Sequence, residues 1–459
     1  MRATLIRGGT LVTPGMVAPA DVLVKGETIA AVGPALSAPP GARLVDARER
    51  LVFPGLIDPH VHLREPGGEH KEDFTTGTRA ALAGGFTTVL AMPNTRPPIT
   101  SHETLAQALA LAASRAVCDF GLFVGATADN AEEAAGCGWH RPLGRLLSAR
   151  STTSVGHAVG LKLYMGASTG NLLVPDLAGQ LAHFERYPGV IALHAEDEEA
   201  VSHFAAQGHR RPPLCAVLAT ARALALAGHL HRRVHICHVS TAQEIALIRD
   251  AKTRGVPVTC EVTPHHLFLT AADEHRLGPL GRMNPPLRSP EDSASLWANL
   301  DVVDCLATDH APHTLAEKRS PTPPAGVPGL ETALPLLLTA VLDQDIDQDT
   351  DQDTGRDVQC VPSSLCEVTR LMAAGPAHTF NLARKGHVAP GYDADLTLVD
   401  PGVEWTIGEH PLLTKCGWSP FNGRQVRGHV ERVFLRGQEV FAHGETLARP
   451  GYGQVIKQE

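Results

Sequence analysis

The sequence lacks paired cysteines, a long run of apolar residues and a secretion-type start, and each absence excludes a class of protein. Its 9 cysteines include no C-x-x-C pair, which argues against a disulfide scaffold and favours free thiols in the cytoplasm. The longest apolar stretch that we identify, Ala333–Leu342, is too short to cross a bilayer and predicts a buried helix. Gly8 and Gly9 interrupt the start of the chain too soon for a signal peptide. These features exclude a disulfide-stapled domain and argue against a membrane protein.

An excess of positive charge is missing as well. The 40 basic and 49 acidic residues give a net charge of −9, which argues against nucleic acid or an anionic membrane as the main partner. We find no internal repeat at the period of about 20–50 residues that solenoids and propellers show. Apolar residues make up 43% of the 459 residues, enough for a large core. The 24 histidines exceed what packing requires and direct attention to metal sites.

Both ends of the chain are typical of β-structure, with short β-rich runs separated by glycine and proline. The candidate strands are Thr4–Arg7, Thr10–Val12, Asp21–Val24 and Thr28–Val32 at the start, and Asp395–Val399, Val430–Leu435 and Glu439–His443 at the end. We expect one small β-sandwich module built from both ends, residues 1–51 and 390–459, around a central domain of residues 52–389.

The central domain alternates buried strands with helices, the pattern of an α/β fold of the (β/α)₈ TIM-barrel type. The predicted strands are Leu56–His60, Phe86–Met92, Asp119–Val124, Val159–Tyr164, Val190–His194, Val234–His238, Val256–Val262 and Val303–Thr308. Predicted helices between them include His102–Arg115, Thr241–Thr253 and Pro290–Asn299.

Asp343–Asp357 interrupts this pattern with a polar, aspartate-rich repeat. The glycine and terminal glutamate of a calcium-binding EF-hand loop are misplaced here, so a disordered acidic surface loop is the better interpretation.

Reactive side chains follow the predicted strand ends, where barrel enzymes build their sites. His60 and His62 are two residues apart in an extended segment, so both rings can lie on one face and hold one cation. An isolated H-x-H pair is as often structural as functional. Lys162 lies inside an apolar run, where its ammonium needs an acidic partner or a lowered pKa. Together with His194, His238 and Asp309, also at strand ends, they predict a metal site.

The order of these residues resembles the amidohydrolase superfamily, and the local motifs resemble dihydroorotase. The similar stretches are DPHVHLREPGGEHKEDFTTGTRAALAGG, AMPNTRPPIT, HICHVS, CEVTPHHLFLT, TDHAPHTLAEK and KCGWSPFNGR, between about Leu51 and Gln454. Several resemble the dihydroorotase domain of the animal multifunctional pyrimidine-synthesis protein, whereas GASTGNLL and RMNPPLRSPED are more similar to free-standing bacterial enzymes. The β-rich start at Met1 favours a free-standing protein.

The resemblance implies reversible hydrolysis of (S)-dihydroorotate to N-carbamoyl-L-aspartate at a binuclear zinc centre with a bridging hydroxide. It assigns His60 and His62 to the more buried ion and His194 and His238 to the more exposed one. Lys162, carbamylated, would bridge the two, and Asp309 would complete the first and serve as both base and acid.

Further residues are implied in binding the substrate. Arg64, Asn94 and His313 correspond to the family's contacts with the substrate carboxylate, and Arg64 has a surface salt bridge with Glu65 as its alternative. Asn284 and backbone groups near Pro328 and Gly329 correspond to contacts with the ring.

Two weaker assignments remain open. Cys237 and Glu261, with His194, resemble a third zinc site of animal-type relatives. Regular strand alternation would turn Cys237 away from the centre, so a buried thiol and a ligand-orienting carboxylate are the alternative. Thr169 belongs either to a flexible lid or to a plain turn within Gly166–Asn171.

Other cyclic amidases, namely hydantoinase, dihydropyrimidinase and allantoinase, share the metal ligands, but a neutral ring has no use for the carboxylate contacts. An inactive scaffold for aspartate carbamoyltransferase is a further alternative, although all six ligands are kept. A homodimer and an association with that transferase are family expectations.

Overall fold

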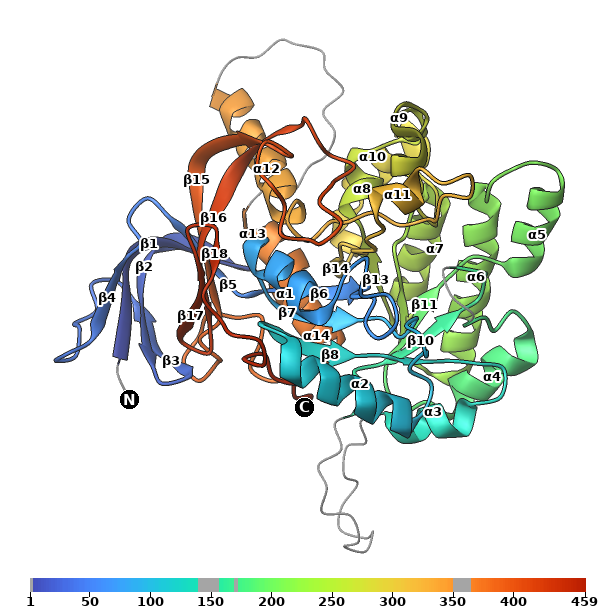
Figure 1. Ribbon diagram of the computed structural model, residues 1–459, viewed down its shortest axis with the longest axis horizontal. Coiled ribbons are helices and arrows are strands. Elements are labelled where there is room, and N and C mark those ends of the chain that lie inside the picture. The colour runs from blue at the N-terminus through green and yellow to red at the C-terminus, as the bar shows by residue number, and fades with distance from the viewer. Residues whose placement is uncertain (1–2, 139–156, 169–171, 350–364) are drawn as a thin grey trace, which may run out of the picture.

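Strands from the two ends of the chain meet in one sheet. In the computed structural model, which describes residues 3–138, 157–168, 172–349 and 365–459, this sheet has nine strands. The strands are β1 (Ala3–Thr13), β2 (Met16–Lys25), β3 (Thr28–Gly33), β4 (Arg43–Asp46), β5 (Leu51–Pro54), β15 (Leu396–Thr406), β16 (Gln425–Leu435), β17 (Gln438–Ala442) and β18 (Glu445–Thr446). β5 joins the two ends, because it pairs with β1 on one side and with β15 on the other (Figure 1). The expected β module from both ends is confirmed, while its boundaries at residues 51 and 390 stay predictions.

One prediction within this sheet is wrong. Thr4–Arg7 and Thr10–Val12 are not two strands but parts of β1, in which the pairing with β2 shifts register between Ile6 and Gly9. Gly8 has φ +78°, so it accommodates a bulge where other residues would be strained, and the strand continues beyond it.

The barrel is built from parallel strands in chain order. These strands are β6 (Leu56–Val61), β7 (Phe86–Ala91), β8 (Asp119–Leu122), β9 (Val124–Gly125), β10 (Leu161–Tyr164), β11 (Ile191–His194), β12 (Val234–Ile236), β13 (Val258–Val262) and β14 (Cys305–Leu306). β8 and β9 share one position, because β8 pairs with β7 and β9 with β10. A bridge between Val61 and His310 closes the ring, so all eight predicted strands occupy their expected places.

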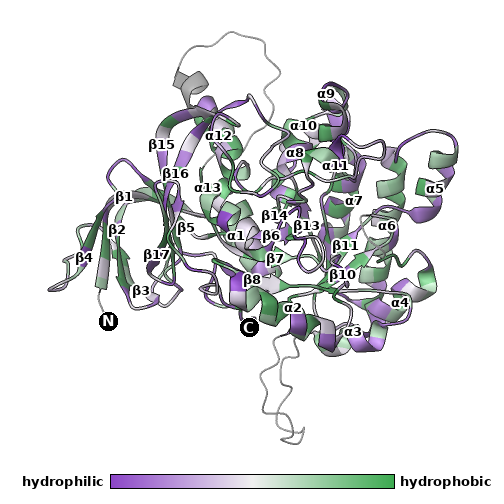
Figure 2. Ribbon diagram, viewed as in Figure 1, coloured by the Kyte–Doolittle hydropathy of each residue, from purple (hydrophilic) through white to green (hydrophobic). Residues whose placement is uncertain are grey.

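Helices surround the barrel and carry both apolar and polar residues (Figure 2). They are α1 (Phe74–Ala83), α2 (His102–Arg115), α3 (Ala131–Cys137), α4 (Leu177–Arg186), α5 (Glu198–Ala206), α6 (Pro213–Leu230), α7 (Ala242–Thr253), α8 (Pro264–Phe268), α9 (Ala271–Leu277), α10 (Pro290–Ala298), α11 (Leu315–Lys318), α12 (Ala333–Asp349), α13 (Leu365–Thr369) and α14 (Gly375–Thr379). Short η1 (Gly278–Gly281), η2 (Leu300–Val302) and η3 (Arg370–Ala374) complete the set. α2 has the predicted bounds, and Ser101 caps it by accepting a hydrogen bond from the Thr104 N–H.

Two helices correct the sequence analysis. α6 is long and apolar enough to cross a membrane by length and composition, and it was not among the predicted apolar stretches. It packs instead against α7 and β12, and its Arg222 forms a salt bridge with Asp197. α12 continues through Asp349, so the first part of the aspartate-rich segment is helical and not a loop. Each added residue there extends an existing helix, which costs far less than starting one. Residues 350–357 lie outside the described residues.

Candidate metal centre and substrate pocket

The six predicted ligands converge at the carboxyl ends of the barrel strands. His60 lies near the end of β6, Lys162 in β10 and His194 at the end of β11. His62 directly follows β6, while His238 and Asp309 come shortly after the ends of β12 and β14. All six are buried, with at most 8% of their surface exposed. Strand order alone brings them together, since parallel strands of a barrel end on one face.

His60, His62 and Asp309 form the first cluster, whose donor atoms lie within 4.8 Å of one another. Asp309 Oδ1 is 3.0 Å from His62 Nε2 and 3.4 Å from His60 Nε2. Burial alone would raise the pKa of Asp309, but the His60 and His62 rings hold it well below its usual range. The carboxylate is therefore ionised and faces two imidazole nitrogens.

His194 and His238 form a second pair. His194 Nδ1 lies 3.0 Å from His238 Nε2, and burial lowers the pKa of both rings, so both are neutral. Nδ1 of His238 is buried and has no hydrogen-bond partner among the described residues. Neutral imidazoles with an unused buried nitrogen are the form in which histidine binds metal ions.

Lys162 lies between these groups without an acidic partner. Its side chain is 1% exposed, and Nζ donates a hydrogen bond to Cys237 Sγ at 3.0 Å. Within the described part of the chain, no carboxylate forms a salt bridge with it. A buried ammonium among metal-type ligands is unfavourable as it stands, which fits a lysine that is modified in the working protein.

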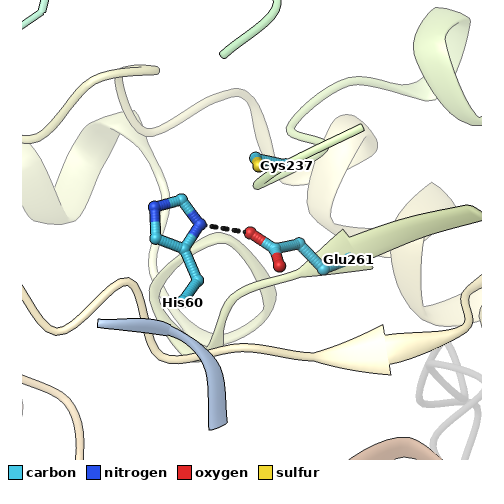
Figure 3. Close-up of side chains that lie close together, drawn as sticks. All are labelled: His60, Cys237 and Glu261. Carbon is cyan, nitrogen blue, oxygen red and sulfur yellow. Dashed lines mark hydrogen bonds and ion pairs between the residues drawn. The ribbon is translucent and has the colours of Figure 1, made fainter. Parts of the chain in front are cut away.

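Glu261 positions His60 from behind. Its Oε1 accepts a hydrogen bond from His60 Nδ1 at 2.5 Å (Figure 3). Its Oε2 lies 3.0 Å from His235 Nε2. The His60 Nε2 atom is thereby directed toward Asp309. A carboxylate behind a ligating histidine sets its tautomer and raises its basicity. The expectation that Glu261 orients a ligand agrees with this arrangement.

Cys237 does not point away from the centre, so the argument from strand alternation is wrong. β12 ends at Ile236, and His238 has φ +40°, so the backbone turns and both Cys237 and His238 face inward. The donor atoms of Cys237 and Glu261 lie within 4.8 Å of those of His60, not His194 (Figure 3). Any third ion at Cys237 and Glu261 would therefore share His60 with the first site.

Two buried carboxylates were not singled out from the sequence. Glu196 Oε2 is 3.2 Å from His194 Nε2, and Glu196 also pairs with Arg211. Asp58 accepts hydrogen bonds from Thr308 and from the His60 N–H, which ties β6 to the residues after β14. Each lies two residues from a predicted ligand, a spacing that could have identified them.

Arg64 is buried beside His313 and does not bind Glu65, which pairs with Arg115 instead. Its Nε donates to the Pro312 carbonyl at 3.1 Å, and Nη2 lies 3.2 Å from His313 Nε2. No carboxylate of the described residues forms a salt bridge with it. Burial lowers the pKa of Arg64 to about 10, so the guanidinium remains charged. The surface alternative is excluded, and a buried cation is available to an anionic ligand.

His313 is held as a neutral ring. Lys71 Nζ donates to its Nδ1 at 3.1 Å, so Nε2 carries the proton and faces the Ala325 carbonyl at 3.1 Å. Burial and the Arg64 and Lys71 cations lower its pKa to about 2. Glu317 pairs with Lys71 at 2.9 Å, so Arg64 is the cation beside this ring that forms no salt bridge with a carboxylate of the described residues.

The remaining predicted contacts lie nearby. Asn94 Oδ1 accepts from His62 Nδ1 at 2.7 Å, so Asn94 also orients a ligand. Asn284 is half-buried. The Gly329 N–H donates to His310 Nδ1, and the Gly329 carbonyl accepts from the Ala333 N–H. The Pro328 carbonyl is therefore the better candidate for a backbone contact with the substrate ring. Thr169 lies outside the described residues.

A cavity of about 820 Å³ lies away from the predicted site. Its lining includes Val159, Val190 and Arg233, which precede β10, β11 and β12, so it opens at the amino ends of the strands. It contains none of the predicted site residues.

Comparison with family models gives two matches. Residues 49–140 match the model described as dihydro-orotase-like, and residues 190–440 match the amidohydrolase family.

Curated relatives match nearly the whole chain. A dihydroorotase from Halobacterium salinarum is 38% identical over 444 residues, covering 93% of this chain and 94% of the relative. A dihydroorotase from Pyrococcus furiosus is 35% identical over 408 residues, covering 89% and 86%. The multifunctional protein CAD of Squalus acanthias is 40% identical over 417 residues, but this chain spans only 16% of its length.

Similar solved structures include other amidohydrolases. An L-hydantoinase (dihydropyrimidinase) from Arthrobacter aurescens has a TM-score of 0.87 and 28% identity, with 100% of both chains covered. A dihydropyrimidinase from Brevibacillus agri has a TM-score of 0.85 and 26% identity, covering 99% of this chain and 98% of the other. Both support the barrel with its separate β domain.

Proposed function

Since this chain belongs to the dihydroorotase family of amidohydrolases, we propose that it interconverts (S)-dihydroorotate and N-carbamoyl-L-aspartate in pyrimidine synthesis. The reaction opens and closes one cyclic amide bond, between a ring carbonyl carbon and a ring nitrogen. The observation that supports this substrate best is the Arg64 guanidinium beside the metal-type ligands. It is buried and forms no salt bridge with a carboxylate of the described residues.

The donor set is suited to two divalent ions, which we propose are zinc. His60, His62 and Asp309 would hold one, and His194 and His238 the other. Lys162 would react with carbon dioxide to form a carbamate, which converts a buried cation into an anion able to hold both. When bound, such ions polarise a carbonyl oxygen and lower the pKa of water toward neutrality. We assign Cys237 and Glu261 to positioning the ligands and not to binding a third ion, since His60 would already bind the first ion.

Asp309 is the proposed proton carrier. Its carboxylate is ionised in the resting protein, because the His60 and His62 rings lower its pKa. In hydrolysis it would take a proton from the attacking water and deliver it to the ring nitrogen that leaves. In synthesis it would remove the ureido proton. General acid–base groups placed in this way contribute about 10²–10⁴-fold in rate.

Arg64 and its neighbours would hold the substrate carboxylate. The planar guanidinium can donate two parallel hydrogen bonds to a carboxylate. Lys71, which also pairs with Glu317, contacts His313, and Asn94 accepts a hydrogen bond from His62. Asn284 and the Pro328–Gly329 backbone are proposed to contact the ring. This pocket would orient the amide carbonyl toward the metal ligands.

The deciding experiment is a substrate panel. Purified protein would be assayed with dihydroorotate, N-carbamoyl-aspartate, hydantoin, dihydrouracil and allantoin under the same conditions. We expect the first two to be interconverted and the three neutral rings to react poorly, because they leave the Arg64 charge unpaired. Faster turnover of hydantoin or dihydrouracil than of dihydroorotate would contradict the proposal.

A second candidate activity is that of a hydantoinase, favoured by the similarity to the Arthrobacter aurescens structure. A shared fold at 28% identity does not specify the ring that is cleaved. The curated dihydroorotases are more similar in sequence, at 35–38% in the two cases above.

Location and partners are further proposals. Eight cysteines of the described residues are free thiols, which fits a reducing cytoplasm. A homodimer and association with an aspartate carbamoyltransferase are proposed from the family.

A further inference from the structure

A second cluster of metal-type donors lies away from the catalytic residues, on the outside of the barrel. His102 begins α2, and Glu133 and Cys137 lie on the adjacent α3. One donor atom from each of the three residues lies within 4.8 Å of the other two. Imidazole, carboxylate and thiolate are the three ligand types that zinc uses in proteins.

The cluster is rigidly supported. Glu133 Oε1 accepts hydrogen bonds from the His102 N–H at 2.8 Å and from His102 Nδ1 at 2.9 Å. At the start of α3, the Asn130 amide donates to the Thr100 carbonyl at 2.9 Å, which fixes α3 against the residues that precede α2. The donors thus lie on two helices that these hydrogen bonds join.

Gly136 makes room for the imidazole. A Cβ atom at this position would lie 2.7 Å from His102 Cε1 and 3.2 Å from Nε2. Any larger residue would push the ring away from Glu133 and Cys137. The third donor, Cys137, is 1% exposed, so a metal ion there would bind a thiolate that is protected from solvent.

We propose that His102, Glu133 and Cys137 form a peripheral binding site for a zinc-like divalent ion, separate from the catalytic centre. The ion replaces the proton between His102 and Glu133 and the proton of the Cys137 thiol. Zinc binds the thiolate form of cysteine, so binding releases the Cys137 proton. A bound ion joins the start of α2 to α3 and stabilises the folded protein in proportion to the logarithm of its concentration.

The test measures metal content and not activity, so it does not depend on the proposed function. Wild-type protein and the variants H102A, C137S and G136A would be dialysed against a series of fixed free zinc concentrations. Zinc per chain would be determined by atomic spectroscopy. Glu132→Gln is the matched control, since it removes a neighbouring exposed carboxylate of α3 that is not in the cluster.

We expect each of the three variants to bind one zinc ion per chain fewer than wild type, and Glu132→Gln to bind the same number. Gly136→Ala is the sharpest arm, because it keeps all three ligands and only displaces the ring. Loaded with cobalt(II), wild type should show a sulfur-to-cobalt band that C137S lacks. Any contribution from Cys237 is present in both proteins and cancels in their difference. Equal zinc content in all five proteins at every concentration would overturn the proposal.

Discussion

Lys162 is the residue whose chemical state decides the charge of the metal centre. As an ammonium it repels cations, and within the described ranges its one hydrogen bond goes to the Cys237 thiol. As a carbamate it would supply negative charge, of which Asp309 provides only part among the proposed ligands. The two proposed divalent ions would therefore depend on the chemical state of this one residue.

Lys162→Ala should therefore lose most of the bound zinc and most of the activity. Small carboxylic acids added to the variant should restore part of the activity, because they can occupy the place of the carbamate. Metal content and turnover would be measured on the same preparation. Two zinc ions per chain with normal turnover would contradict the bridging role.

Asp309→Asn keeps the shape of the side chain but removes its ability to take up a proton. We expect kcat for dihydroorotate to fall by about 10²–10⁴-fold, with a much smaller change in KM. Metal content would be measured as well, since Asp309 is also a proposed ligand. Turnover within about tenfold of wild type would mean that another group carries the proton.

Arg64→Gln tests the choice of substrate. Loss of one partner of a buried charge pair costs about 2–5 kcal/mol, which corresponds to a fall in kcat/KM for dihydroorotate of roughly 30- to 4,000-fold. Dihydrouracil has the same ring without the carboxylate, so its low rate should barely change.

The control for this variant is its zinc content, which should equal that of wild type. If both substrates lose the same factor, Arg64 supports the site as a whole and does not select the carboxylate.

At the scale of elements, the segment Leu413–Trp418 fastens the loops beneath the site. Trp418 Nε1 donates to the His313 carbonyl at 2.8 Å, and Thr414 Oγ1 donates to Glu72 at 2.5 Å. The Leu413 and Thr414 N–H groups both donate to the Glu331 carboxylate at 2.9 Å. Trp418 belongs to the motif KCGWSPFNGR, so its hydrogen bond joins that motif to His313 of the motif TDHAPHTLAEK.

Glu331 makes this fastening sensitive to pH. Burial raises its pKa from 4.5 to about 7, against the effect of the Leu413 and Thr414 N–H groups. Between these values the unfolded chain has lost the proton and the folded protein keeps it, so stability falls as pH rises from about 4.5 to about 7. The shift in the pKa of Glu331 corresponds to a fall of about 3 kcal/mol in the free energy of unfolding.

Glu331→Gln removes this titration. The Tm of wild type minus the Tm of the variant should therefore be larger at pH 5 than at pH 8. Calorimetric Tm values of both proteins at both pH values check the sign. A difference in Tm that does not change with pH would contradict it.

At the scale of the whole molecule, a buried charge cluster joins the barrel to the β domain. Lys385 Nζ contacts Asp119 of β8 at 2.7 Å, Asp395 before β15 at 2.6 Å and Asp393 at 3.1 Å. Arg436, after β16, also pairs with Asp119. Burial alone would lower the pKa of Lys385, but the three carboxylates raise it, so the ammonium is charged in the folded protein.

Lys385→Met should destabilise the protein by about 3–5 kcal/mol, because it leaves the buried Asp395 without a salt-bridge partner among the described residues and Asp119 with Arg436 alone. We expect a fall of several degrees in Tm, while kcat per folded molecule stays close to wild type, since Asp119 begins β8 at the end of the barrel opposite the site. Lys25→Met, at an exposed position of the β domain, is the control and should leave Tm unchanged. Equal Tm values for both variants would contradict a structural role of the cluster.

The sequence by itself determined the order of the barrel strands and the positions of the six predicted ligands, because both depend on local patterns. Apolar runs of strand length predict strands, and parallel strands end on one face, so His60, Lys162 and Asp309 had to meet. The β module from both ends and the helix α2 were also predicted from local signals. The extent of α12 was not, since a helix can continue into residues with little tendency to start one.

Only the tertiary structure decided which groups stand behind the ligands and which way they face. Glu261 reaches His60 across 201 positions of sequence, and Lys71 reaches His313 across 242. Cys237 faces inward because β12 stops at Ile236, before its predicted end at His238, and the backbone of His238 turns to positive φ. Such contacts depend on where separate strands and loops end in space, and a periodic pattern within one segment carries no information about that.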